Sequence, residues 1–277
     1  MRIRPKNPCE SRGSRMTRLD GSGSVCRSVA RQLAVFAAAG LMVMVGACST
    51  TQTAASVDTT YQPYACLPPP RSTPPVPVPG APQRVAVIGD SYTNGSPQGG
   101  TGQHRWTAVV ERDLRARGYD VAIDLGAEGG SGYVTPGNRG DVFADKVATT
   151  VRPDDAMVVF FGSRNDSRAS EGDLAHATCT ALVNAEIAAP GAQLIVIGPP
   201  WVDANPPRYV QRARDILQDR AESLHARFID PLADGWFVDR PDLIGTDGVH
   251  PTNEGHAYMA QRITPVIESM MAAHAAP

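Results

Sequence analysis

Three polar residues in this chain have the types and contexts that nucleophilic catalysis requires. Ser91 lies three residues after the apolar, β-branched segment 85–88, where a buried strand is expected to end and the backbone to turn sharply. A serine hydroxyl is a poor nucleophile unless a base takes its proton, and the base needs a partner that fixes its tautomer. His250 is the candidate base. Asp247, three residues earlier, can lie on the same side of one turn and accept a hydrogen bond from Nδ1, which leaves Nε2 to face Ser91.

The same chemistry needs hydrogen-bond donors for the oxyanion that forms when a serine attacks a carbonyl. The backbone N–H of Ser91 is one candidate. The backbone N–H of Gly129 is a second, because glycine allows close approach, and the side-chain amide of Asn165 is a third. Each of these signals is weak alone, but together they predict acyl transfer to a serine.

An alternating pattern of strands and helices positions these residues. Strands are expected at 85–88, 121–125, 156–161, 194–197 and 227–229, and helices at 104–117, 141–151, 173–188, 208–226 and 254–273. Such alternation predicts an α/β fold, a three-layer α/β/α sandwich with a central, mainly parallel five-stranded sheet. Ligands of these sheets bind beyond the carboxyl ends of the strands, and Ser91, Gly129 and Asn165 follow the first three strands.

The first 83 residues are expected to lie outside this domain. Residues 1–47 combine an arginine-rich region with an apolar run too short for a comfortable bilayer span, which is typical of a signal peptide. The basic region is long for such a peptide, so Met16 is an alternative start. Residues 48–83 are polar and then rich in proline, which predicts a flexible tether and a semi-rigid spacer, with a recognition role for the prolines as the alternative. Residues 84–277 form the expected catalytic domain.

The cysteines indicate export. The small residues before Cys48 resemble a bacterial lipobox, which implies cleavage before Cys48 and a lipid on that cysteine; the alternative is an ordinary signal cleavage site near an unrelated cysteine. The mature chain would then keep Cys66 and Cys179. In an oxidising compartment these two form a plausible disulfide, and two unpaired thiols are the alternative.

Four sequence blocks, in order, resemble those of the SGNH hydrolases, also called the GDSL esterase/lipase family. They are Gly89-Asp90-Ser91, the glycine block 126–130, Asn165-Asp166 and Asp247-x-x-His250, and the resemblance runs from about residue 84 to 273. It implies a flavodoxin-like sheet, Ser91 as nucleophile, His250 and Asp247 completing the triad, and Gly129 and Asn165 in the oxyanion hole. Asp90 shapes the turn in this family and is no triad member.

This sequence departs from the family pattern in the third block. Two residues, Ser163 and Arg164, separate Gly162 from Asn165 where the family usually has one. The extra residue could shift the Asn165 amide or bring Arg164 to the substrate. Trp201, which follows the fourth strand, is a second candidate for substrate contact.

The resulting hypothesis is an exported esterase that acts on lipid or glycan esters at the cell envelope, lipid-anchored to the outer face of the membrane. An acyltransferase with the same triad is the alternative, and a non-catalytic glycan- or lipid-binding lipoprotein is a third reading. No cofactor or metal ion is expected, because no histidine has ligand spacing around it. The formal net charge of −2 gives no reason to expect a nucleic acid partner.

Overall fold

The computed structural model describes residues 66–67 and 80–274. The described residues belong to one compact unit. The expected signal peptide 1–47, Cys48 and most of the expected tether 48–83 lie outside the described residues, so the statements about them stay predictions.

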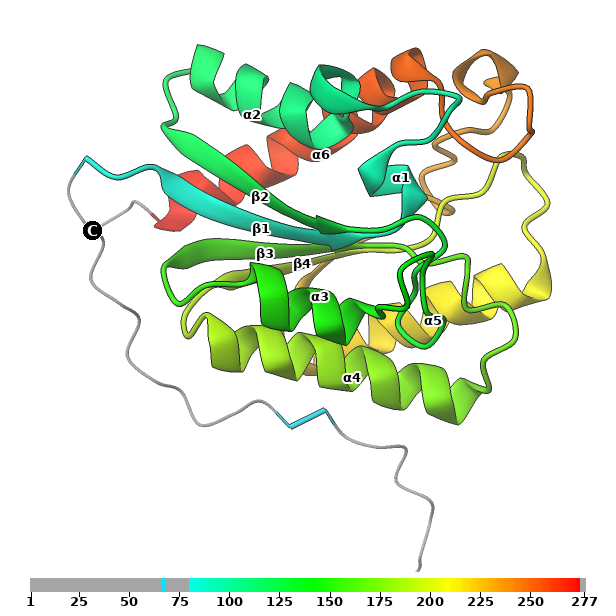
Figure 1. Ribbon diagram of the computed structural model, residues 1–277, viewed down its shortest axis with the longest axis horizontal. Coiled ribbons are helices and arrows are strands. Elements are labelled where there is room, and N and C mark those ends of the chain that lie inside the picture. The colour runs from blue at the N-terminus through cyan, green and yellow to red at the C-terminus, as the bar shows by residue number, and fades with distance from the viewer. Residues whose placement is uncertain (1–65, 68–79, 275–277) are drawn as a thin grey trace, which may run out of the picture. The chain divides into compact units, whose positions relative to one another are not determined.

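A parallel five-stranded sheet forms the centre of the domain. Its strands are β1 (Gln83–Gly89), β2 (Val121–Ala127), β3 (Asp155–Phe161), β4 (Gln193–Ile197) and β5 (Arg227–Ile229). They lie in the order β2-β1-β3-β4-β5, and every neighbouring pair is parallel (Figure 1). This is the flavodoxin-like order, and it confirms the predicted fold class.

Helices cover both faces of the sheet. The two on one face are α2 (Trp106–Ala116) and α6 (Asn253–His274), and those on the other are α3 (Phe143–Thr150), α4 (Glu171–Ala188) and α5 (Arg208–Ser223) (Figure 1). Successive side chains of a strand point to opposite faces. Val85 and Val87 accordingly pack in the core beside α2 and α6, whereas Ala86 and Ile88 pack in the core beside α3 and α4. Burial on both faces explains the continuous apolar strands of the sequence.

The short elements were not predicted. They are the helix α1 (Ser91–Asn94) and the 3-10 helices η1 (Gly102–His104) and η2 (Pro241–Leu243). The helix expected at 141–151 begins only at Phe143, since Val142 is still extended. The side chain of Asp141 instead contacts Lys146 from the preceding loop.

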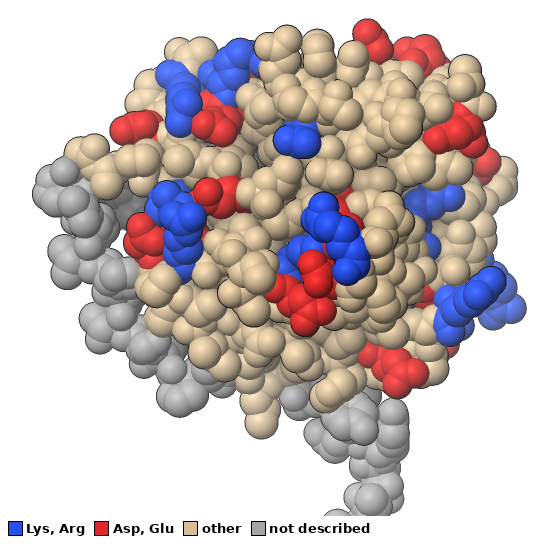
Figure 2. Space-filling view, viewed as in Figure 1, with Lys and Arg blue, Asp and Glu red and all other residues tan. Residues whose placement is uncertain are grey.

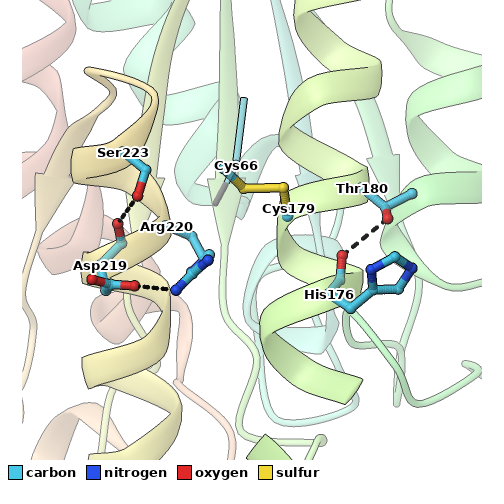
Figure 3. Close-up of a disulfide and its surroundings, with 7 residues drawn as sticks. All are labelled: Cys66, His176, Cys179, Thr180, Asp219, Arg220 and Ser223. Atoms are coloured by element: carbon cyan, nitrogen blue, oxygen red, sulfur yellow. Dashed lines mark hydrogen bonds and ion pairs between the residues drawn. A yellow bond between two sulfur atoms is a disulfide. The ribbon is translucent and has the colours of Figure 1, made fainter. Parts of the chain in front are cut away.

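A disulfide joins Cys66 to Cys179 on α4, with their Cα atoms 5.4 Å apart. Figure 3 shows the bond beside α4. Cys66 is only 3% exposed and packs in the core formed with α4 and α5. The structure therefore contains the paired form rather than two thiols, and it fixes one residue of the expected tether against the domain.

The face of the molecule in Figure 2 carries mixed charge. On the face in Figure 2, basic and acidic side chains lie next to one another, whereas a nucleic acid site gathers Lys and Arg into a patch or stripe. Within the described ranges, the structure has no helix with the length and apolar composition needed to cross a membrane.

Candidate active site

The carboxyl edge of the sheet brings the candidate nucleophile to the surface. Ser91 is the first residue of α1, and a single residue, Asp90, separates it from the end of β1. Asp90 caps this helix: its Oδ1 accepts a hydrogen bond of 2.8 Å from the N–H of Tyr92. The chain changes from strand to helix at this cap, within one residue. Ser91 therefore lies at the sharp backbone turn that was expected for a nucleophile.

Ser91, His250 and Asp247 form a continuous hydrogen-bonded chain. Nε2 of His250 lies 3.0 Å from Oγ of Ser91, and Nδ1 of His250 lies 2.7 Å from Oδ2 of Asp247. A carboxylate only accepts, so Nδ1 carries the proton and Nε2 is left as the acceptor for the serine hydroxyl. This is the arrangement in which an imidazole can remove a hydroxyl proton.

Asp247 is held as a carboxylate by the loop that follows η2. Desolvation alone would raise its pKa, but hydrogen bonds from the backbone and ring of His250 and from the backbone of Val249 outweigh it and lower the pKa to about 2. Asp247 is therefore ionised throughout the pH range in which a histidine base is neutral. The side chains of His250 and Asp247 are 27% and 33% exposed, so the chain opens to solvent.

Two backbone N–H groups beside Ser91 are available as oxyanion donors. A Cβ added at Gly129 would lie 4.0 Å from Cβ of Ser91, so the backbone after β2 closely approaches the serine. In the part of the chain that the structure describes, neither the N–H of Ser91 nor that of Gly129 donates to another protein group. Both groups can therefore donate hydrogen bonds to a negatively charged oxygen of a substrate.

The amide of Asn165 is engaged elsewhere. Its Nδ2 donates to the carbonyl of Ser131 at 2.8 Å and to Oδ2 of Asp90 at 3.3 Å. A primary amide carries two hydrogens, and both have acceptors here. The structure thus brings Asn165 to the residue before Ser91, while its role as a third oxyanion donor stays a prediction that requires one of these bonds to be exchanged for the substrate.

Asp90 lies at the centre of a buried network instead of in the triad. Its Oδ2 also accepts from Oγ of Ser163 at 3.0 Å, and that hydroxyl lies 3.0 Å from the carbonyl of Ser131. Burial raises the pKa of Asp90 to about 6, against the lowering effect of the bonds from Tyr92 and Ser163. Ser163, the first of the two residues between Gly162 and Asn165, therefore links the loops after β1, β2 and β3.

Tyr92 is a site residue that sequence reasoning missed. Its buried hydroxyl donates to the carbonyl of Val249, the residue before His250, at 2.5 Å, and the rings of Tyr92 and His250 are 6.4 Å apart. Burial raises the pKa of Tyr92 to about 12, so it stays a donor. It fixes the histidine loop relative to α1, and its position next to Ser91 was the available signal.

A second missed feature supports the loop that carries Gly129. Glu128 and Lys146 are both buried and form an ion pair, and Lys146 also contacts Asp141 at 2.6 Å. Glu128 additionally accepts from the backbone N–H of Arg139. Burial by itself would raise the pKa of Glu128, and these bonds lower it. The signal in the sequence was a lysine, one of only two in the chain, placed between Phe143 and Val147 on an apolar helix face.

Arg164 and Trp201, the two candidate substrate contacts, lie against each other. Cζ of Arg164 is 4.1 Å from the centroid of the Trp201 ring, and Nη1 lies 3.4 Å from the hydroxyl of Tyr92. Both side chains are partly exposed. No group of three or more His, Cys, Asp or Glu side chains among the described residues is arranged to hold a metal ion.

The free energy of unfolding is expected to depend on the protonation of a second histidine, His256. His256 is fully buried on α6, its Nδ1 accepts from the N–H of Trp106, and burial followed by the charges of Arg105 and His250 lowers its pKa to about 4. The unfolded chain, with a histidine pKa of about 6.5, binds more protons between these values, so stability is lost as the pH falls from about 6.5 toward 4. Asp90 acts in the opposite direction, because its raised pKa favours the folded state below about 6.

We predict that His256→Asn, which keeps an acceptor for Trp106, removes this acid sensitivity. The difference in unfolding free energy between wild type and variant should shrink by about 2 to 3 kcal/mol between pH 7.5 and pH 4.5. Urea unfolding of both proteins at the two pH values measures it, and the contribution of Asp90 cancels in the difference. A constant difference across this range would contradict the prediction.

Comparison with known proteins places this geometry in context. The model of the GDSL-like Lipase/Acylhydrolase family matches residues 87–258, which include Ser91, Gly129, Asn165, Asp247 and His250. A GDSL lipase of Mycobacterium tuberculosis is 51% identical over 186 residues, which cover 66% of this chain and 80% of that protein.

Solved structures share the fold at low sequence identity. The lipase/acylhydrolase from Enterococcus faecalis has a TM-score of 0.52 and 18% identity, and the match covers 68% of this chain and 96% of that one. A family two carbohydrate esterase from Clostridium thermocellum in complex with cellohexaose has a TM-score of 0.54 and 16% identity, over 71% of this chain and 67% of that one. At these identities the likeness shows the fold alone.

Proposed function

This chain belongs to the GDSL-like lipase/acylhydrolase family and is a hydrolase of the SGNH type, and from that premise we propose that it cleaves acyl or acetyl esters through Ser91, His250 and Asp247. The observation that carries the proposal is the chain of contacts from Asp247 through His250 to Ser91, at 2.7 and 3.0 Å. It supplies a nucleophile, its base and the group that orients the base in one connected unit.

In the first half of the reaction, Oγ of Ser91 attacks the ester carbonyl while Nε2 of His250 takes its proton. A C–O bond forms, and the carbonyl becomes an oxyanion bound by the N–H groups of Ser91 and Gly129. Asp247 stabilises the imidazolium through Nδ1. The tetrahedral species then collapses, the alcohol leaves with the proton from Nε2, and Ser91 carries the acyl group.

In the second half, water replaces the alcohol. His250 takes a proton from the water as it attacks the acyl-enzyme, and the same two N–H groups bind the second oxyanion. Collapse returns the proton to Oγ of Ser91 and releases the carboxylic acid. A hydroxyl of a sugar or another alcohol in place of water would make the protein an acyltransferase.

We also propose that the protein acts at the cell envelope. Support comes from the arginine-rich and apolar sequence before Cys48 and from the Cys66–Cys179 disulfide, because disulfides form and persist in oxidising compartments. A lipid on Cys48 would anchor the enzyme to the outer face of the membrane, where lipid and glycan esters are within its reach.

Hydrolysis and transfer are separated by a product analysis. We expect wild-type protein to release 4-nitrophenol from 4-nitrophenyl acetate at a rate that carbohydrate acceptors do not change, with acetate as the product. Mass spectrometry of the mixture detects any acylated sugar. Acylated sugar formed in proportion to the nitrophenol would favour the acyltransferase, and a folded protein that releases no nitrophenol from short 4-nitrophenyl esters would contradict the esterase.

A further inference from the structure

The guanidinium of Arg164 is a positive charge beside the triad that forms no ion pair with a carboxylate of the described chain. Its polar contact is the hydroxyl of Tyr92, and its other contact is the ring of Trp201. Asp166, two residues further on, is directed away: its oxygens accept from the backbone N–H groups of Tyr133, Val134 and Thr135. The nearest acidic group in sequence is therefore already committed to another loop.

The fold places this charge at the same edge of the sheet as Ser91. Arg164 follows β3 and Trp201 follows β4, and β3 lies between β1, which leads to Ser91, and β4. Arg164 contacts Tyr92, the residue after Ser91, and Tyr92 in turn holds the carbonyl of Val249 beside His250. The positive charge of Arg164 acts to lower the pKa values of Asp90 and Tyr92, the two residues that flank the nucleophile in sequence.

The Trp201 ring holds the guanidinium in a way that suits anion binding. A guanidinium lying over an aromatic ring uses its face for the ring and keeps N–H donors at its edge. Those donors form a fork that matches the two oxygens of a carboxylate or phosphate. The ring of Trp201 also packs edge-on against Tyr209 of α5, with ring centroids 6.3 Å apart. This contact helps to fix the position of the Trp201 ring.

We propose that Arg164 and Trp201 form a subsite for an anionic group, so that the preferred substrates are esters that carry a carboxylate or phosphate near the scissile bond. This inference rests on the proposed esterase function, and it adds the chemical class of the substrate. Hydrogen bonds between charged groups in such a subsite correspond to about a 10- to 100-fold preference over a neutral isostere.

Matched substrate pairs test the proposal on both sides of the ester. For the acyl side, the 4-nitrophenyl half-ester of adipic acid is compared with the same ester ending in a carboxamide. For the alcohol side, 4-acetoxybenzoate is compared with 4-acetoxybenzamide. The quantity measured is the ratio of kcat/KM for the anionic over the neutral member, after subtraction of the uncatalysed rate.

We expect Arg164→Gln to lower this ratio about 10- to 100-fold for at least one pair, and Arg164→Lys to restore part of it. Added salt should lower the wild-type ratio. Arg112→Gln, which changes an exposed arginine of α2, is the matched control and should leave the ratio unchanged. Taking a ratio removes any loss of activity that is common to both substrates.

Tyr92→Phe separates recognition from positioning, because it removes the hydroxyl that links Arg164 to the histidine loop. The ratio should survive in this variant, even if both rates fall. The proposal is overturned if Arg164→Gln leaves both ratios unchanged, or if Tyr92→Phe abolishes the preference as fully as Arg164→Gln does. A folded wild-type protein that cleaves none of the four esters would contradict the esterase function itself, which is a different outcome.

Discussion

Replacing His250 with alanine is expected to lower kcat for ester hydrolysis by about 10⁴- to 10⁶-fold. Nε2 of His250 is the group within 3.0 Å of Ser91 Oγ that can take its proton, and without it the serine attacks as a neutral hydroxyl. The unfolding free energy should change by less than about 1 kcal/mol, because the side chain is partly exposed and the backbone bonds of the loop do not depend on the imidazole. Steady-state kinetics with 4-nitrophenyl acetate and urea unfolding measure the two quantities.

A matched histidine controls for the substitution itself. His176 lies on the exposed side of α4, so His176→Ala should keep wild-type kcat. If His250→Ala kept substantial turnover, or unfolded the protein while His176→Ala did not, the histidine would have a structural role and the proposed mechanism would be wrong.

Replacing Lys146 with methionine is expected to destabilise the protein by about 3 to 5 kcal/mol. Methionine fills similar space but leaves the carboxylate of Glu128 buried without its cation, since the remaining partner Arg139 is largely exposed and its Nε lies 3.7 Å away. Urea unfolding at neutral pH measures the loss. Because Glu128 directly precedes Gly129, kcat should fall as well, while a purely distant defect would leave it unchanged.

Two further variants locate the origin of this loss. Arg139→Gln removes the exposed partner of the same carboxylate and should cost at most about 1 kcal/mol. Adding Glu128→Gln to Lys146→Met removes the unpaired charge and should recover part of the stability. A double variant less stable than Lys146→Met would show that the buried carboxylate is not the source of the destabilisation.

The strands and long helices could be predicted because burial determines them directly. Residues 85–88 of β1 and 157–161 of β3 are buried, and both segments are correspondingly continuous runs of apolar residues. The helix α1 could not be predicted in this way, since four residues have no periodicity, and it depends on a single cap by Asp90. The start of α3 was misplaced by two residues because Asp141, a good first-turn residue, is used by Lys146 instead.

The residues of the site could be predicted from the sequence, whereas many of the contacts between them could not. Ser91, His250 and Asp247 each follow a recognisable local pattern, and the structure brings their atoms within hydrogen-bonding distance. The partners of Asn165 could not be inferred, because they depend on how the loops after β2 and β3 meet at Ser131. The same holds for the pairing of Arg164 with Trp201, residues from two different loops.

Covalent labelling of the nucleophile tests the central claim most directly. The folded wild-type protein is incubated with a fluorophosphonate, which phosphonylates an activated serine, and its mass and labelled peptide are determined. We predict one adduct per chain, located on Ser91, and none on Ser91→Ala under the same conditions. Equal labelling of Ser91→Ala, labelling at another residue, or a folded wild-type protein that stays unlabelled would contradict the assignment of Ser91 as the catalytic nucleophile.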